Sequence, residues 1–128
     1  MADNLYWHEP LMRSEGAVPS ILAIGDSWFW YPLPGGSLAS ALARLVAPRG
    51  HTLLAFGNNG AEAFDYVDGV YAPLIAGALE RYGTGCSAVF VSGGGNDFAG
   101  FTDLRPLLGM DCSACTSEDA CFNHGPGE

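Results

Sequence analysis

The chain has 128 residues, of which 48% are hydrophobic and 15% are charged, a balance typical of one globular domain and not of a disordered chain. Its 14 acidic and 5 basic side chains give a net charge of −9, which disfavours binding to nucleic acid or to anionic lipid. No apolar run approaches the roughly twenty residues that cross a membrane, and residues 1–19 lack the apolar core of a secretory signal, so we expect a cytoplasmic protein.

Residues 1–19 are polar with a few aromatic side chains, and we predict that they form a lead-in to the first strand. Pro19 holds the chain extended before the apolar run 20–24, which we predict as that strand. The strand ends in the turn Gly25-Asp26-Ser27. A short apolar run bounded by glycine is typical of a strand buried on both faces of a helix-covered parallel sheet.

Four aromatic residues, 28–31, follow this turn. They are expected either to wall a pocket for an acyl chain or a sugar, or to lie in the core, and the sequence does not separate these two interpretations. The prolines within 32–36 predict a loop. Ser37 is then expected to cap a helix that runs to about Ala47. One face of that helix carries Leu38, Leu42 and Leu45.

A second strand is predicted over 51–56. It is followed by the loop Gly57-Asn58-Asn59-Gly60, whose residue types suit positive φ angles and exposed backbone amides. We predict a short helix over 61–68 and a longer one over 71–82. The longer helix has an apolar face that is expected to point inward, made of Leu74, Ile75, Ala78 and Leu79.

The apolar run 88–92 predicts a third strand, again buried on both faces, which ends in Gly93-Gly94-Gly95-Asn96-Asp97. One helical turn is expected around 103–108. Alternating strands and helices predict an α/β fold with a doubly wound parallel sheet. Covered sheets of this type usually have about five or more strands, so a sheet of three is expected to be incomplete.

The polar residues at the strand ends predict a reactive site, because ligands of open α/β sheets bind at the carboxyl ends of the strands. Ser27 and Asn96 are expected to face one crevice, the first as a nucleophile and the second as a hydrogen-bond donor. Structural roles are the alternatives, since a serine can cap a helix and an asparagine can brace its turn. Asp26 and Asp97 are expected to be acceptors that stabilise their turns.

With these turns in this order, the chain resembles the SGNH (GDSL-type) hydrolases over about residues 20–101. The resemblance rests on the blocks Gly25-Asp26-Ser27, Gly57-Asn58-Asn59-Gly60 and Gly94-Gly95-Asn96-Asp97. It implies a flavodoxin-like, three-layer α/β/α fold and an esterase or lipase that forms an acyl-enzyme on Ser27. It also implies that the backbone amides of Ser27 and Gly60 and the side-chain amide of Asn96 hold the oxyanion. The implied substrate is a small ester, a lipid or an acetylated sugar, with no metal or organic cofactor.

The chain departs from this family where the general base is expected. An Asp-x-x-His motif is absent, and the histidines of the chain are His8, His51 and His124. His8 precedes the first strand, His51 is expected at the edge of the sheet opposite the crevice, and His124 has a cysteine three residues upstream. The sequence therefore resembles one part of such an enzyme, in which a complementing C-terminal segment or a second copy supplies the base. A binding or structural module without activity is the alternative.

Three cysteines lie close together in a C-terminal tail, 110–128, which we separate from a hydrolase-like domain over 20–109. These cysteines, Cys112, Cys115 and Cys121, together with His124 offer four potential zinc ligands. Such a set without a second Cys-x-x-Cys pair is more typical of a local disulfide or of free thiols. We therefore predict no metal site.

Overall fold

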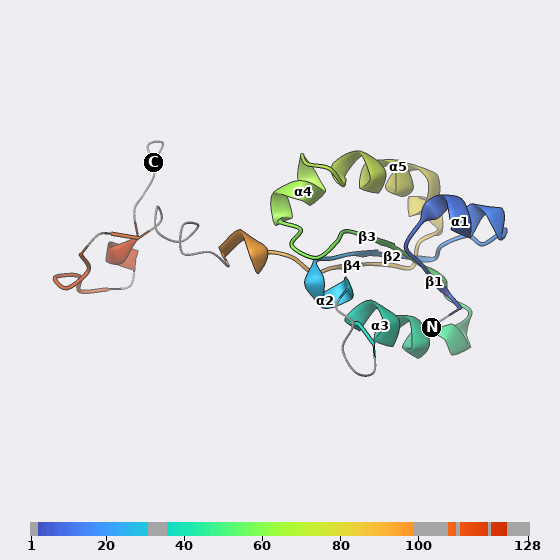
Figure 1. Ribbon diagram of the computed structural model, residues 1–128, viewed down its shortest axis with the longest axis horizontal. Helices are drawn as coiled ribbons and strands as arrows, with labels where there is room; N and C mark the ends of the chain where they lie inside the picture. The colour runs from blue at the N-terminus through green and yellow to red at the C-terminus, as the bar shows by residue number, and fades with distance from the viewer. Residues whose placement is uncertain (1–2, 31–35, 99–107, 110, 118, 123–128) are drawn as a thin grey trace. The chain divides into compact units, whose positions relative to one another are not determined.

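The computed structural model describes residues 3–30, 36–98, 108–109, 111–117 and 119–122. The chain divides into two compact units, residues 1–93 and residues 94–128, and each is described by itself. Figure 1 shows that the first unit holds the sheet and the α-helices.

A four-stranded, all-parallel sheet forms the centre of the first unit (Figure 1). Its strands, in the order β1-β3-β2-β4, are β1 (Leu5–Tyr6), β2 (Ile21–Ile24), β3 (Leu53–Phe56) and β4 (Ala88–Val91). On β2, Ile21 is in register with Leu53 of β3 on one side and with Ala88 of β4 on the other. The predicted α/β class with a parallel sheet is confirmed.

The segment that we predicted as a lead-in, residues 1–19, contributes a fourth strand and a helix. β1 pairs with β3, where the backbone N–H of Leu53 donates to the carbonyl of Asn4 at 2.8 Å. The helix α1 (Glu9–Ser14) follows and buries Met12 completely. A strand of two residues has no periodicity of its own, so the sequence pattern did not reveal it.

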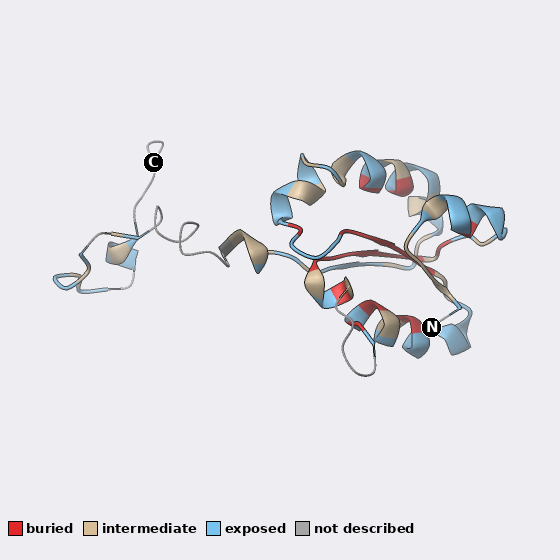
Figure 2. Ribbon diagram, in the orientation of Figure 1, coloured by how far each residue is buried: buried red, intermediate tan, exposed pale blue. Residues whose placement is uncertain are grey.

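Helices cover both faces of the sheet and give three layers (Figures 1 and 2). On one face, α1 and α5 (Ala72–Tyr82) form a core with the strands whose buried members are Met12, Leu22, Ile24, Leu54, Phe56, Ile75 and Ala78. On the other face, α2 (Ser27–Trp30) and α3 (Leu38–Val46) form a core whose buried members are Ile21, Ala23, Phe29, Ala39, Ala43, Leu53 and Ala55. Successive side chains of a strand point to opposite faces, so β2 and β3 supply both cores.

The helix α3 begins where it was predicted but buries a different face. The hydroxyl of Ser37 caps it by accepting a backbone N–H of the first turn at 3.2 Å. Ala39 and Ala43 face the sheet, whereas Leu38 and Leu45 of the predicted apolar face are 54% and 75% exposed. The small alanine side chains let the helix backbone approach the strands closely, and of the three leucines Leu42 packs against the same core.

Two further helices of the first unit, α4 (Ala63–Val67) and α5, fall within the ranges predicted for them. The short 3-10 turns η1 (Ala47–Arg49) and η2 (Gly83–Gly85) follow α3 and α5 and were not predicted. On α5 the predicted inward face is half right, because Ile75 and Ala78 are buried while Leu74 and Leu79 are exposed.

A salt bridge joins α1 to α5, with a carboxylate oxygen of Glu9 2.6 Å from the guanidinium of Arg81. The hydroxyl of Tyr82 donates to the same carboxylate at 2.8 Å. Partial burial opposes ionisation of Glu9, but the hydrogen bonds from Arg81 and Tyr82 outweigh it and hold the pKa of this carboxyl below its usual value. The contact fixes α1, which the sequence did not predict, against α5.

The strand β4 is not buried on both faces as predicted. It lies at one edge of the sheet, and its residues Val89, Phe90 and Val91 are 46%, 40% and 66% exposed. Figure 2 shows the contrast between the buried strands β2 and β3 and the exposed β4. Among the described residues of this unit, no strand pairs with the outer edge of β4.

The described residues of the second unit include the 3-10 turns η3 (Asn96–Phe98) and η5 (Asp119–Cys121) and an isolated antiparallel bridge between Leu108 and Phe122. A disulfide joins Cys112 to Cys121, while Cys115 is a free thiol. Most of the helical turn expected around 103–108 lies outside the described residues. In the part of the chain that the structure describes, no helix is both long and apolar enough to cross a membrane.

Candidate active site

The ends of β2 and β3 lie against each other, and each strand is followed directly by a glycine. The backbone N–H of Gly25 donates to the carbonyl of Phe56 at 2.9 Å. Gly57 has a φ of +115°, and a Cβ at this position would overlap the carbonyl oxygen of Gly25. The two turns that carry the first two sequence blocks are therefore in direct backbone contact at one edge of the sheet.

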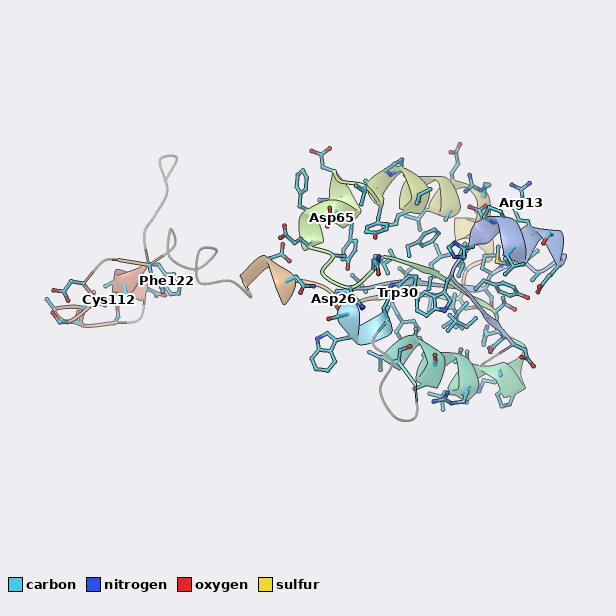
Figure 3. All side chains as sticks on the ribbon, viewed as in Figure 1. Arg13, Asp26, Trp30, Asp65, Cys112 and Phe122 are labelled. Carbon is cyan, nitrogen blue, oxygen red and sulfur yellow. A yellow bond between two sulfur atoms is a disulfide. The ribbon has the colours of Figure 1, made fainter. Side chains whose placement is uncertain are left out.

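Asp26 links the turn after β2 to the end of β4 (Figure 3). Its side chain is 2% exposed and accepts hydrogen bonds at 3.2 Å from the backbone N–H of Trp28 and from the hydroxyl of Ser92. The backbone N–H of Ser92 also donates to Ile24 at 2.8 Å. The predicted role of Asp26 as a turn acceptor is confirmed. Ser92 was missed, although a serine directly after a strand whose neighbour ends in an aspartate turn is a usable signal.

Ser27 is the first residue of α2 and is half-buried. The carboxylate of Asp26, and not the hydroxyl of Ser27, accepts the first free N–H of this helix, so the capping role that was the alternative for Ser27 belongs to Asp26. No group among the described residues forms a hydrogen bond with the hydroxyl of Ser27. This hydroxyl has no structural role in the described part of the chain.

Gly60 closes the loop after β3 and is exposed, with a φ of +81° as predicted for this loop. The loop is folded by Asn58, whose carbonyl accepts the N–H of Ala61 at 3.1 Å and whose side chain accepts the N–H of Asn59 at 2.8 Å. The N–H of Gly60 has no acceptor in the described part of the chain. It is thus a backbone donor left unused by the fold.

Asn96, the third predicted site residue, begins η3 in the second unit. The chain reaches it soon after Ser92, the residue that is bound to Asp26. Its convergence with Ser27 on one oxyanion stays a prediction.

The described histidines lie away from Ser27. The ring Nδ1 of His51 is 2.9 Å from the hydroxyl of Ser20, which precedes β2, so His51 lies at the amino end of the strands as predicted. His8 is exposed at the N-terminus of α1, which lies at the opposite end of the sheet from α2 (Figure 1). His124 lies outside the described residues. No histidine that the structure describes is placed to take a proton from Ser27.

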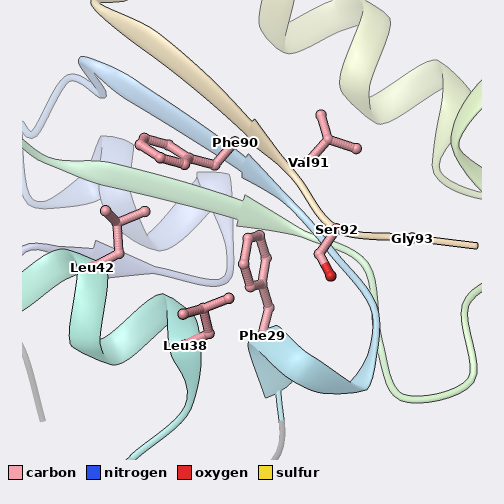
Figure 4. Close-up of a pocket in the computed structure, with 7 residues that line it drawn as sticks. All are labelled: Phe29, Leu38, Leu42, Phe90, Val91, Ser92 and Gly93. Carbon is pink, nitrogen blue, oxygen red and sulfur yellow. The ribbon is translucent and has the colours of Figure 1, made fainter. Parts of the chain in front are cut away.

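A groove of about 410 Å³ opens beside the end of β4 (Figure 4). Its walls come from α2, α3, β4 and the turn that follows β4, and they are formed by Phe29, Leu38, Leu42, Phe90, Val91, Ser92 and Gly93. Figure 4 shows Phe29, Leu38, Leu42 and Phe90 gathered on one side of β4, with Val91 on the opposite side and the hydroxyl of Ser92 at the end of the strand. The groove is therefore mostly apolar, with one hydroxyl near the Asp26 turn.

The aromatic residues 28–31 divide between the two roles left open for them. Phe29 is buried in the core and also lines the groove, and Trp28 is 65% exposed. Trp30 packs on Trp7 with ring centroids 3.9 Å apart, and its indole N–H has no partner among the described residues. Tyr31 lies outside the described residues.

No protein-family model, no curated protein and no solved structure matches this chain. The functional interpretation therefore rests on the residues themselves. Two observations are central: the backbone contact between Gly25 and Gly57, and the hydrogen bond from Ser92 to Asp26.

Proposed function

We propose that the chain is an SGNH (GDSL-type) ester hydrolase that forms an acyl-enzyme on Ser27. The observation that supports this proposal best is the meeting of three strand ends. Asp26 is bonded to Ser92 after β4, and Gly25 contacts Gly57 after β3, so the ends of β2, β3 and β4 that precede the three sequence blocks share one edge. Chemistry in open parallel sheets occurs at this edge.

In the proposed reaction the hydroxyl oxygen of Ser27 attacks the ester carbonyl and the alcohol leaves. The negative charge on the carbonyl oxygen is held by the backbone N–H groups of Ser27 and Gly60 and by the side-chain amide of Asn96. Fixed donors stabilise such charge because they need no reorganisation during the reaction, and the loss of one donor costs roughly a hundred- to thousandfold in turnover.

The proton of Ser27 needs an acceptor. Since no described histidine lies near Ser27, the proton goes to water or to a base supplied by a complementing segment or a second copy. Hydrolases stripped of their triads keep about a thousand- to ten-thousandfold over water from positioning and the oxyanion donors. The chain alone is therefore expected to be a slow esterase.

The groove beside β4 indicates the part of the ester that is bound. Phe29, Leu42 and Phe90 give it an apolar wall that fits an acyl chain or an acetyl group better than a charged group. The net charge of −9 also disfavours anionic substrates. We propose a small neutral ester as the substrate class.

A fluorophosphonate probe and p-nitrophenyl acetate test the nucleophile. We expect the intact chain to be labelled and Ser27→Ala to lose labelling, because the covalent bond to the probe forms at this hydroxyl, while hydrolysis by Ser27→Ala should fall to the rate that the oxyanion donors sustain without a nucleophile. The control is Ser14→Ala, which removes an exposed hydroxyl at the end of α1 and should change neither readout. Equal labelling of Ser27→Ala and the intact chain contradicts the proposal. An unlabelled intact chain favours the non-catalytic binding module.

One observation supports a second candidate, in which the chain is one part of a larger or split hydrolase. The outermost strand β4 presents Val89, Phe90 and Val91, of which Val91 is 66% exposed. An exposed apolar edge strand is a template for pairing with another strand. A complementing segment or a second copy that continues the sheet here also offers a source for the missing base.

We expect the chain to self-associate through β4, and Val91→Lys to weaken this association by roughly tenfold or more, because a charge at an edge strand opposes pairing. Sedimentation velocity over a concentration series measures the effect. Leu45→Lys is the matched control, since Leu45 is 75% exposed on α3 and does not line the groove. A chain that stays monomeric at all concentrations, or equal effects of the two lysines, contradicts pairing at β4.

A further inference from the structure

Three cysteine sulfurs of the second unit lie together. The Sγ atoms of Cys112, Cys115 and Cys121 are all within 4.8 Å of one another, and all three residues are half-buried. A tetrahedral site with Zn–S bonds of about 2.3 Å places its sulfurs about 3.8 Å apart. Cys112 and Cys121 are joined by a disulfide in this structure and the free sulfur of Cys115 lies within 4.8 Å of both, so reduction of the disulfide leaves three sulfurs within reach of one such site.

The backbone around the sulfurs is pinned by local contacts. The N–H of Cys115 donates to the carbonyl of Cys112 at 3.0 Å, which closes a tight turn between these two cysteines. The N–H of Gly109 donates to the carbonyl of Cys121 at 2.6 Å, beside the Leu108–Phe122 bridge. The loop between the first and last cysteine is thus closed at its base, and Figure 3 shows Cys112 and Phe122 in it.

Gly109 brings this base close to the sulfurs. A Cβ at position 109 would lie 3.2 Å from the carbonyl oxygen of Cys121 and 3.5 Å from the sulfur of Cys112. The backbone of Gly109 and the turn from Cys112 to Cys115 therefore both lie against the cysteine cluster. This arrangement does not depend on the disulfide alone, because Cys115 is a free thiol and still lies in the cluster.

The charged residues near the three cysteines favour the binding of a cation over a role for these cysteines as reactive thiolates. Reactive thiolates are typically found beside basic side chains, but the sequence has no lysine or arginine from residue 106 to its end. Asp111 and Asp119 lie on the loop instead. The carboxylate of Asp111, next to Cys112 in the chain, accepts the backbone N–H of Ser113 at 2.9 Å.

We propose that the reduced chain binds one soft divalent cation of the zinc class through the thiolates of Cys112, Cys115 and Cys121. Each thiol releases its proton to the solvent when its sulfur binds the metal. Thiolate ligands select zinc-class ions over calcium or magnesium. The disulfide between Cys112 and Cys121 is the oxidised form of the same cluster, in which two of the three ligands are occupied. The proposal is independent of the function proposed for Ser27.

The test is a titration of the full chain with Co²⁺, a spectroscopic substitute for zinc, after reduction with a phosphine under argon. We expect one Co²⁺ per chain with intense thiolate-to-cobalt absorption, displaced by one equivalent of Zn²⁺. The oxidised chain should bind no Co²⁺ in this mode, because its disulfide removes two thiolates. A reduced chain without thiolate-to-cobalt absorption, or the same spectrum from the oxidised chain, overturns the proposal.

Two serine variants locate the site. Cys115→Ser should weaken Co²⁺ binding by roughly a hundredfold, since it removes a direct ligand. Cys86→Ser is the control and should leave binding unchanged, because Cys86 is the other free cysteine and lies in the first unit, just before β4. Equal losses in the two variants, or none in Cys115→Ser, would assign the absorption to thiols outside this cluster.

Discussion

Gly57→Ala is expected to destabilise the first unit by about 3–5 kcal/mol, a large share of the roughly 5–15 kcal/mol that holds a small domain folded. The added Cβ overlaps the carbonyl oxygen of Gly25, and the φ of +115° is strained for any residue with a side chain. The backbone of Gly25 cannot retreat without losing its hydrogen bond to Phe56. Urea unfolding followed by tryptophan fluorescence measures the loss.

Gly50→Ala separates the two causes of this effect. Gly50 also has a positive φ, +76°, but a Cβ there has no neighbour within 4 Å. Its substitution should cost only about 1 kcal/mol, the strain of a left-handed conformation. If the two alanine variants lose equal stability, the close approach of the turns after β2 and β3 has no energetic consequence, and the proposed site is not held together there.

The central strands were predictable because burial on both faces leaves a continuous apolar run. Residues 21–24 and 53–56 are such runs, and each is bounded by glycine. The start of α3 was predictable for a local reason as well, since Ser37 caps it through a bond within one turn. Local patterns therefore gave the class of the fold and most element bounds.

Features that depend on distant partners were not predictable. Whether alanine or leucine faces the sheet on α3 depends on how closely the helix approaches it, and the sequence spacing fits Leu38 and Leu42 as well as Ala39 and Ala43. The exposure of β4 depends on whether another strand covers it. The apolar sequence pattern of β4 is the same whether or not another strand covers it.

In the candidate site too, the local features were predictable and the long-range contacts were not. Ser27 and Gly60 were recognisable from their glycine-rich turns. In the structure, neither the hydroxyl of Ser27 nor the backbone N–H of Gly60 has a hydrogen-bond partner among the described residues. The hydrogen bond between Asp26 and Ser92 joins residues 66 positions apart, so it could be expected only from their places after neighbouring strands and not from their spacing in the sequence. Together with the backbone N–H of Ser92, which donates to the carbonyl of Ile24, this bond ties the turn of Ser27 to the end of β4.

Asp26→Ala is therefore the second substitution with a large expected effect. It leaves the N–H of Trp28 and the hydroxyl of Ser92 without their buried acceptor, which should cost about 2–4 kcal/mol of stability. It should also lower ester turnover by roughly tenfold or more in the fraction that stays folded, because the turn that carries Ser27 is no longer tied to β4. Urea unfolding and p-nitrophenyl acetate hydrolysis of the same samples measure both effects.

The variants Asp26→Asn and Ser92→Ala show how much of the stability lost in Asp26→Ala is due to the hydrogen bond between Asp26 and Ser92. Asp26→Asn keeps an acceptor oxygen and should recover most of the stability, whereas Ser92→Ala removes one of the two bonds and should cost about 1 kcal/mol. In the double variant Asp26→Ala/Ser92→Ala, the loss should be smaller than the sum of the single losses by about 1 kcal/mol, since both remove one shared bond. Strictly additive losses would mean that the side chain of Asp26 acts only on its own turn and adds nothing to the contact between this turn and β4.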